Sequence, residues 1–164
     1  MPRMMTIARL AMVAGVALGL AACAKNGANG GADLSITGGA AAPGSTQDFT
    51  VNVGDRVFFL TDSSEFTQEA VATLNRQVQW LQRYPQYTFI IEGHADERGT
   101  REYNIALGAR RANAVQAYFA SRGIAPNRMR TISYGKERPV AVCDDISCWS
   151  QNRRAVIVLT NAGV

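Results

Sequence analysis

An arginine within an apolar stripe of a predicted helix is the most chemically informative residue of the chain. Leu107, Arg111 and Val115 are spaced four apart in a helix predicted over residues 103–122. They therefore share one face, which should point toward a sheet. A guanidinium group does not lose its proton, so its burial there requires a carboxylate or an equivalent acceptor.

Acidic side chains lie at the C-terminal end of a predicted strand over residues 87–92: Glu92, Asp96 and Glu97. Ligands of open α/β sheets bind at this C-terminal edge of the strands. If Arg111 meets an acid here, the two form either a structural ion pair or a site for a zwitterion. In the second case Arg111 binds a ligand carboxylate through two hydrogen bonds, and Asp96 binds the ligand's ammonium group. The residues alone leave both interpretations open.

Catalytic chemistry is not favoured by the other polar residues. His94 lies among the acids, but it is the chain's only histidine, and no Ser or Cys nucleophile stands at a recognisable spacing. We interpret it as a structural hydrogen-bonding residue and expect no catalytic residue, metal site or cofactor.

Three further residues have open roles. Arg153 and Arg154 should either line the site or form a solvated edge, and we expect one of them at the rim. Trp149 is either a cover for the core or an exposed partner contact.

Hydrophobic spacing predicts the elements that must position these residues. An apolar run over residues 56–60 predicts a first strand. A helix begins after Thr67, a good N-cap, and ends at Tyr84, because the residue before Pro85 disfavours helical angles. The later elements are strands over residues 87–92, 128–134 and 155–159, and a helix over residues 103–122 closed by Gly123.

This order of elements predicts the fold class. Strand, helix, strand, helix and strand are followed by a longer loop and a last strand. The expected fold is α/β, an α+β sandwich in which two main helices pack on a four-stranded mixed sheet. We assign residues 49–164 to this single domain, which is long enough for one modest core.

Residues 1–22 have the pattern of a signal peptide. A positively charged start precedes Leu10–Ala22, an uncharged run too short to span a bilayer. The run ends Leu20-Ala21-Ala22-Cys23, which resembles a bacterial lipoprotein box. This predicts cleavage before Cys23 and lipid attachment to its thiol. The alternative is an ordinary secretory signal followed by a chance cysteine.

Cleavage at the lipoprotein box affects both the expected location and the net charge of the mature protein. Ala24 stands where an aspartate would retain an enteric lipoprotein at the inner membrane, so it favours the outer membrane. Cleavage removes Arg3 and Arg9, which lowers the formal net charge from +4 to +2. A small positive charge and export from the cytoplasm together argue against a nucleic-acid partner.

Residues 24–48 predict a tether. Twelve of these 25 residues are Gly or Ala, and they show no helical or strand period. Such a segment does not bury enough apolar surface to offset its ordering entropy. We therefore expect a lipid anchor on Cys23, a flexible tether to residue 48, and a domain held near a membrane surface.

Two cysteines remain once Cys23 is assigned to lipid. Cys143 and Cys148 lie in the predicted loop before the last strand, with four residues between them. In an oxidising compartment we expect them to form a disulfide that closes the segment from Asp144 to Ser147. Two cysteines alone do not make a metal site.

The site residues also fit a longer pattern. The chain reads Gly93-His-Ala-Asp-Glu-Arg-Gly-Thr-Arg-Glu-Tyr-Asn104, followed by Leu107 and Arg110-Arg-Ala112. This strongly resembles the OmpA-like peptidoglycan-binding domain, whose motif reads G-H-x-D-x-x-G-x-x-x-x-N-x-x-L-S-x-x-R-A. Ser133-Tyr-Gly-Lys-Glu-Arg-Pro139 and Asn152-Arg-Arg-Ala155 also resemble the lipoproteins of that family. The resemblance covers about residues 55–160.

The resemblance implies non-covalent binding of the peptidoglycan stem peptide at meso-diaminopimelate. That residue carries a free amine and a free carboxylate at its distal centre. The family's aspartate matches Asp96 and its helix arginine matches Arg111, in agreement with the zwitterion interpretation. The other matched ligand-binding positions are Asp62, Thr100, Asn104 and Leu107. Two departures are Gly108, which replaces the motif's serine, and Leu60-Thr61, where related proteins often have an aromatic beside the acid.

The sequence thus predicts a non-enzymatic lipoprotein that ties the outer membrane to the cell wall, with its domain in the periplasm. The resemblance implies Tol proteins as partners, chiefly TolB, on a surface that overlaps the peptidoglycan site. A cell-wall hydrolase that uses the acids near Asp96 is one alternative. A flagellar stator subunit, which shares the domain, is another, but it needs a spanning helix, and Leu10–Cys23 is short.

Overall fold

The computed structural model describes residues 41–161. The expected signal peptide over residues 1–22, the lipidation of Cys23 and the tether as far as residue 40 lie outside the described residues. In the described part of the chain, no helix is long and apolar enough to cross a membrane.

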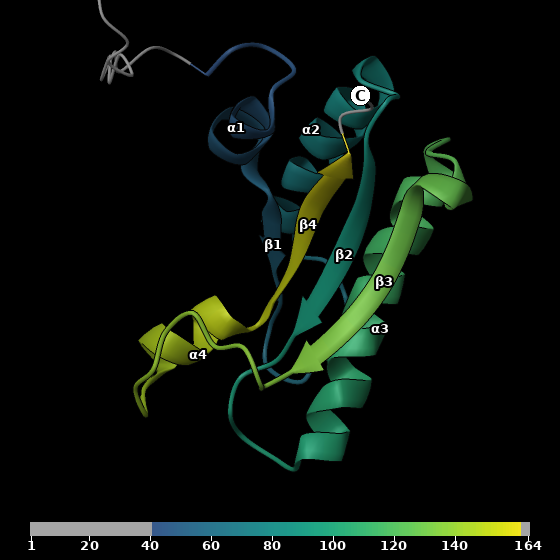
Figure 1. Cartoon of the computed structure of the whole chain (residues 1–164). Helices are drawn as coiled ribbons and strands as arrows, with labels where there is room; N and C mark the ends of the chain where they lie inside the picture. Colours follow the sequence, from purple (N-terminus) through teal and green to yellow (C-terminus); the bar gives the residue numbers. More distant parts are fainter. Residues whose placement is uncertain (1–40, 162–164) are drawn as a thin grey trace, which may run out of the picture. The chain divides into compact units, whose positions relative to one another are not determined.

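A four-stranded mixed sheet forms the centre of the domain (Figure 1). Its order is β1 (Arg56–Phe58), β4 (Arg154–Asn161), β2 (Thr88–His94) and β3 (Met129–Gly135). β4 runs antiparallel to β1 and to β2, and β2 runs parallel to β3. The last strand of the chain therefore lies between the first two, next to the strand that leads to the predicted site.

Two long helices pack on one face of this sheet (Figure 1). They are α2 (Gln68–Arg83), capped by Thr67, and α3 (Arg101–Ser121), capped by Thr100. The core lies between the helices and the sheet, and its central side chains are Leu74, Leu81, Phe89, Ile91, Val115, Phe119 and Ile157. The predicted fold class, two main helices on a four-stranded mixed sheet, is confirmed.

Four shorter elements were not predicted: α1 (Thr46–Asp48), the π-helical turn η1 (Phe49–Gly54), the 3₁₀ turn η2 (Pro126–Arg128) and α4 (Ile146–Asn152). The contacts of the domain also begin before the expected boundary at residue 49. Asp48 accepts a hydrogen bond from the Trp80 indole at 2.8 Å, and the Gly44 carbonyl accepts one from the Tyr87 hydroxyl at 2.7 Å. These tertiary contacts hold the end of the segment that composition alone assigns to the tether.

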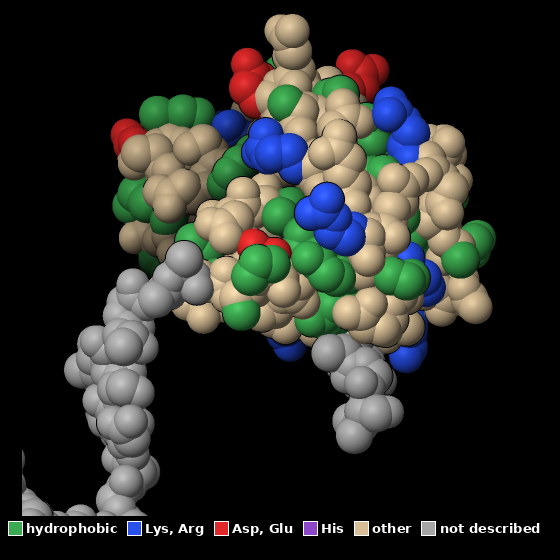
Figure 2. All heavy atoms as spheres, turned by 90° about the horizontal axis from the view of Figure 1, so that it is seen from above, with side chains coloured by type: hydrophobic (Ala, Val, Ile, Leu, Met, Phe, Trp, Pro, Cys, Tyr) green, Lys and Arg blue, Asp and Glu red, His purple; other side chains and the backbone are tan. Residues whose placement is uncertain are grey.

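The charged residues at one end of the domain are dispersed. Figure 2 views the end where β4 finishes, and Lys and Arg side chains there are separated by hydrophobic and uncharged ones. This end carries no continuous basic patch of the kind that phosphate backbones require.

A pair of glycines brings α3 close to β2. A Cβ atom on Gly93 would collide with the backbone carbonyl of Gly108, and one on Gly108 would meet the Gly93 backbone and the Ser133 hydroxyl. The Ser133 hydroxyl donates to the carbonyl of Ile105 at 2.7 Å. Gly108, which replaces the motif's serine, thus lies at the contact between α3 and β2. Ser133 supplies a hydroxyl group beside it.

We expect Gly93→Ala to lower the free energy of unfolding by about 3 kcal/mol, because the added methyl group meets backbone atoms that have no space to yield. Urea denaturation followed by circular dichroism measures this change. An unchanged midpoint would show that helix and strand do not approach each other this closely.

Candidate functional site

A polar hollow of about 280 Å³ opens beside the C-terminal end of β2. Its lining residues are Thr61, Asp62, Asp96, Arg98, Gly99, Tyr103, Asn104, Leu107 and Arg111. Five of the six predicted ligand-binding residues therefore meet in one place, although they come from the segment after β1, the loop after β2 and the first half of α3. The sixth, Thr100, lies at the start of α3 and does not line the hollow.

Arg111 is completely buried at the base of this hollow, as its apolar stripe predicts. Its Nε donates to the carbonyl of Ser63 at 2.9 Å, and its Nη2 donates to that of Leu60 at 3.1 Å. Its Nη1 donates to the carbonyl of His94 at 2.7 Å. These bonds use three of the five N–H groups and leave one on each terminal nitrogen.

The partners of Arg111 bear on one of the two sequence-based interpretations, the structural ion pair. Over residues 41–161 it forms no ion pair with a carboxylate, so the structural ion pair is not found. Desolvation lowers the pKa of Arg111 to about 10. The guanidinium is still protonated at neutral pH, and neutral carbonyl dipoles surround its positive charge.

Asp96, unlike Arg111, has charged partners, because two arginines bind its carboxylate. Arg98 donates from Nη2 to Oδ2 at 2.7 Å and from Nε to Oδ1 at 3.2 Å, and its backbone N–H reaches Oδ1 at 3.2 Å. Arg153 donates from Nη1 to Oδ2 at 3.3 Å. Burial alone would raise the pKa of Asp96, but these hydrogen bonds outweigh it, so the pKa lies below its ordinary value. Asp96 is therefore ionised at neutral pH.

The remaining predicted residues shape the wall of the hollow. Thr100 caps α3 by accepting from the Tyr103 N–H at 3.2 Å, and the Asn104 amide donates to the carbonyl of Arg98 at 2.8 Å. Asp62 has a left-handed backbone, with φ of 55°, and its carboxylate accepts a hydrogen bond from the Tyr103 hydroxyl. Leu107 supplies buried apolar surface. Thr100 and Asn104 thus order the loop and the helix start.

Two of the three acids at the C-terminal end of β2 and in the loop after it do not line the hollow. Glu92 lies 3.5 Å from the His94 imidazole, measured from Oε2 to Nε2. Glu97 is exposed and accepts a hydrogen bond from Trp149. Only Asp96 of this group is available to a ligand of Arg111.

The interpretation of His94 as a hydrogen-bonding side chain was wrong. The ring is buried, and neither of its nitrogens has a hydrogen-bond partner among the described residues. Desolvation, together with the positive charges of Arg154, Arg138 and Arg56, lowers its pKa to about 4. The ring is neutral at pH 7, and the group that does bond is the backbone carbonyl of His94, to Arg111.

Arg153, directly before β4, and Arg154, its first residue, have different hydrogen-bond partners. Arg153 reaches Asp96 and donates from Nε to the Phe59 carbonyl at 3.1 Å, so it supports the site from behind. Arg154 donates instead to the carbonyls of Asn152 and Arg138. Both side chains are buried, so neither forms a solvated edge.

The predicted disulfide is present. Cys143 and Cys148 are bonded, with their Cα atoms 5.7 Å apart. The expected loop around them contains α4, so Cys148 and Trp149 are helical residues. Asp145 caps this helix by accepting from the Ser147 N–H at 2.8 Å.

Four residues that line the hollow were not among the predicted ligand-binding residues: Thr61, Arg98, Gly99 and Tyr103. Of these, Arg98 and Tyr103 bind its carboxylates. Arg98 occupies a variable position of the motif, and its only local signal is its place two residues after Asp96, where an Asp side chain can bond its own loop. Tyr103 lies in the first turn of α3 and is half-exposed. Its role depends on Asp62, a residue brought close only by the fold.

Comparisons with known proteins agree with this architecture. The family model described as "OmpA family" matches residues 58–153. A peptidoglycan-associated lipoprotein of Rhizobium meliloti (strain 1021) is 66% identical over 98% of this chain and 94% of its own length. The chain belongs to the OmpA family, among its peptidoglycan-associated lipoproteins. The matched OmpA region contains every residue that lines the hollow.

More distant OmpA-family relatives give the same result. A peptidoglycan-associated lipoprotein of Pseudomonas aeruginosa is 43% identical over 90% of this chain and 92% of its own. The crystal structure of the peptidoglycan-associated lipoprotein from Burkholderia pseudomallei is 42% identical, with a TM-score of 0.62 over 65% of this chain and 90% of that one. The C-terminal domain of Helicobacter pylori MotB has the same TM-score, 0.62, at 23% identity, and shares the fold.

The neutral, buried His94 should make stability depend on pH. Its ordinary pKa is 6.5 and its folded value is about 4, so between these values the unfolded chain binds a proton that the folded chain does not. Stability is complete above pH 6.5 and falls as the pH drops toward 4, by up to about 3 kcal/mol.

Urea denaturation of wild type and His94→Phe from pH 7 to pH 4.5 measures this contribution. Carboxylates affect both proteins, and the chain has no second histidine, so the difference between the two curves isolates His94. Parallel curves would contradict the assignment of a lowered pKa.

Proposed function

We propose that this protein binds peptidoglycan non-covalently at meso-diaminopimelate and, through a lipid on Cys23, anchors the outer membrane to the cell wall. The observation that carries the proposal is the hollow that contains both an ionised carboxylate, Asp96, and a buried cationic guanidinium, Arg111. A zwitterionic centre with an amine and a carboxylate on the same carbon matches this pair of opposite charges.

The proposed contacts use the groups that the fold leaves available. Arg111 has one N–H on each terminal nitrogen beyond its carbonyl bonds, and parallel N–H groups suit a carboxylate. Asp96 offers its oxygens to the ligand's ammonium in an orientation that its bonds to Arg98 and Arg153 fix. Asp62, Asn104 and Leu107 add polar and apolar contact on the remaining walls, and Thr100 acts through the helix start.

No bond is made or broken in this function, and we propose that the protein is not an enzyme. The relatives named above are peptidoglycan-associated lipoproteins, which supports a binding role. The lowered pKa of Asp96 also suits a permanent anion better than a general acid, which must be protonated at working pH.

The proposed setting is the cell outer membrane, with the domain facing the periplasm. We propose TolB and other Tol proteins as partners, at a surface that overlaps the hollow. The resemblance to the family's lipoproteins supports this, and the lipoprotein box supports the membrane anchor.

The ligand specificity can be tested without altering the protein. We expect a soluble stem tripeptide that ends in meso-diaminopimelate to bind at least about tenfold more tightly than the same tripeptide with lysine, which lacks the distal carboxylate. The difference corresponds to one hydrogen-bonded charge pair with Arg111. Isothermal titration calorimetry measures both affinities, and equal affinities would contradict the role of Arg111.

Sacculus pull-down extends the same test to intact wall. Asp96→Asn should lose binding, whereas Glu102→Gln should bind as wild type does, because Glu102 is an exposed acid of α3 outside the hollow. Thermal denaturation of each variant separates lost binding from lost folding. The soluble fraction is also examined for muropeptides, and their release would support a hydrolase instead.

Lipid attachment distinguishes an anchored lipoprotein from a stator subunit with a spanning helix. We expect mass spectrometry of the membrane-extracted protein to show loss of residues 1–22 and an acylated Cys23. Cys23→Ser should abolish both the lipid and the membrane fraction of the protein. An uncleaved, unmodified N-terminus would overturn the anchor.

A further inference from the structure

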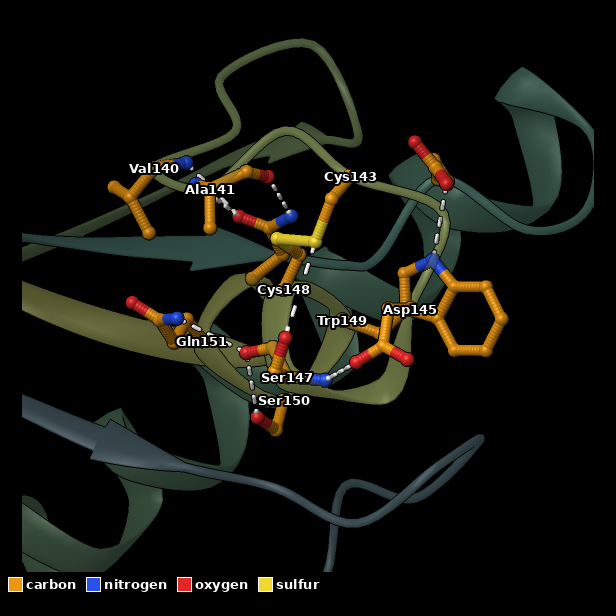
Figure 3. The surroundings of a disulfide bond; sticks show 11 residues. Val140, Ala141, Cys143, Asp145, Ser147, Cys148, Trp149, Ser150 and Gln151 are labelled. Carbon is orange, nitrogen blue, oxygen red and sulfur yellow. Dashed lines mark hydrogen bonds between the residues drawn. A yellow bond between two sulfur atoms is a disulfide. The ribbon is translucent and has the colours of Figure 1, made fainter.

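Helix α4 reaches the loop after β2 through one side chain. The Trp149 indole Nε1 donates to the Glu97 carboxylate at 2.9 Å, the contact drawn from the indole in Figure 3. The guanidinium carbon of Arg98 lies 4.2 Å from the centre of the Trp149 ring, the geometry of a cation–π contact. One aromatic residue therefore contacts two consecutive residues of the loop that carries Asp96.

The helix that carries this tryptophan is braced on both sides. The Cys143–Cys148 disulfide ties it to the preceding segment, directly beside Trp149 (Figure 3). At its other end the Asn152 side chain accepts from the Val140 N–H at 2.8 Å and donates to the Ala141 carbonyl at 2.8 Å. These contacts fix α4, because a seven-residue helix has little stability of its own.

Arg98 is held between this ring and the site. Its edge binds Asp96 through Nε and Nη2, and its face lies on Trp149. The side chain is 40% exposed, and its Nη2 also donates to the Thr61 hydroxyl at 3.4 Å, so the ring covers a face that would otherwise meet solvent and limits the movement of the guanidinium. We propose that Trp149 is a positioning residue, which fixes the Arg98–Asp96 pair and thereby the carboxylate that receives a ligand's ammonium group.

Arg153 also binds the Asp96 carboxylate, but the remaining supports of the loop act on its backbone. Lys136 donates to the carbonyls of Glu97 and Gly99 at 3.1 and 2.8 Å, and the Ala95 N–H donates to the Gly135 carbonyl at 2.8 Å. Trp149 is only half-buried and is not among the core residues. Its specific contribution is therefore the orientation of the Arg98 side chain, and not the fold of the loop.

The positioning role is testable without ligand, by hydrogen exchange measured by NMR in the full chain. The Arg98 Nε–H donates to Asp96 Oδ1 at 3.2 Å, so its exchange reports whether the side-chain pair is formed. We expect Trp149→Ala to raise its exchange rate about threefold to tenfold, the equivalent of one cation–π contact. The Ala95 amide should not change. Ile146→Ala, at an exposed apolar residue of the same helix, should change neither N–H group.

The consequence for binding rests on the proposed function. With the diaminopimelate tripeptide as probe, we expect Trp149→Ala to bind about tenfold more weakly, through the loss of a cation–π contact and a hydrogen bond. Trp149→Phe keeps the ring under Arg98 and should bind within about threefold of wild type. Ile146→Ala should bind as wild type does.

Removal of the disulfide provides a second, independent test. Because it braces α4, Cys143→Ser combined with Cys148→Ser should speed Arg98 exchange in the same direction as Trp149→Ala. A reducing agent should do so in wild type and have no effect on the double variant. Thermal melts of each protein confirm that the domain is folded.

The outcomes separate this proposal from the function it refines. Unchanged Arg98 exchange in Trp149→Ala would overturn the positioning role, and so would faster exchange with undiminished tripeptide affinity. Faster exchange in a protein whose wild type does not bind the tripeptide would overturn the proposed function and leave the positioning of Arg98 established.

Discussion

The buried guanidinium of Arg111 constrains the whole end of the domain where the hollow lies. A charge without water requires acceptors on several sides, or its desolvation outweighs any gain from packing. The acceptors here are backbone carbonyls from two separate segments, Leu60 and Ser63 after β1 and His94 at the end of β2. The central sheet, the loop after β1 and α3 must therefore all be in place before the charge is accommodated.

This constraint also explains the charge distribution around the hollow. Carbonyl dipoles stabilise Arg111 without cancelling its charge, so the base of the hollow attracts an anion. Asp96, at the side of the hollow, instead binds two guanidinium groups and is held ionised. On the far side of β2 desolvation, together with the charges of Arg154, Arg138 and Arg56, keeps His94 neutral. The hollow thus offers an available charge of each sign to one ligand.

Several of these features follow from the sequence, and the reasons are physical. Helical spacing placed Arg111 on the buried stripe with Leu107 and Val115, and all three are buried. The acceptors of its guanidinium were not predictable, because every residue type carries a backbone carbonyl. Helix α4 escaped prediction because it is one short, polar segment stabilised by a disulfide and by Asn152.

The domain also begins earlier than the local sequence pattern predicts, again because the deciding contacts are with distant residues. Glycine and alanine dominate the segment before residue 49, yet Asp48 is held by Trp80, a contact that only the packed helix α2 creates. Contacts between distant residues also explain why Arg98 was missed. Its alignment depends on Asp96 in its own loop and on Trp149 in a helix much later in the chain.

Arg98 and Arg111 illustrate how the same side chain serves two purposes in one hollow. Arg111 is immobilised by burial and by three carbonyls, so it is preorganised for a carboxylate. Arg98 is partly exposed and binds both oxygens of Asp96, so in the proposed complex it orients the carboxylate that receives an ammonium group. The proposed contact with the wall is then specific at both charges, because Arg111 is fixed for a carboxylate and Arg98 fixes the carboxylate that binds the amine.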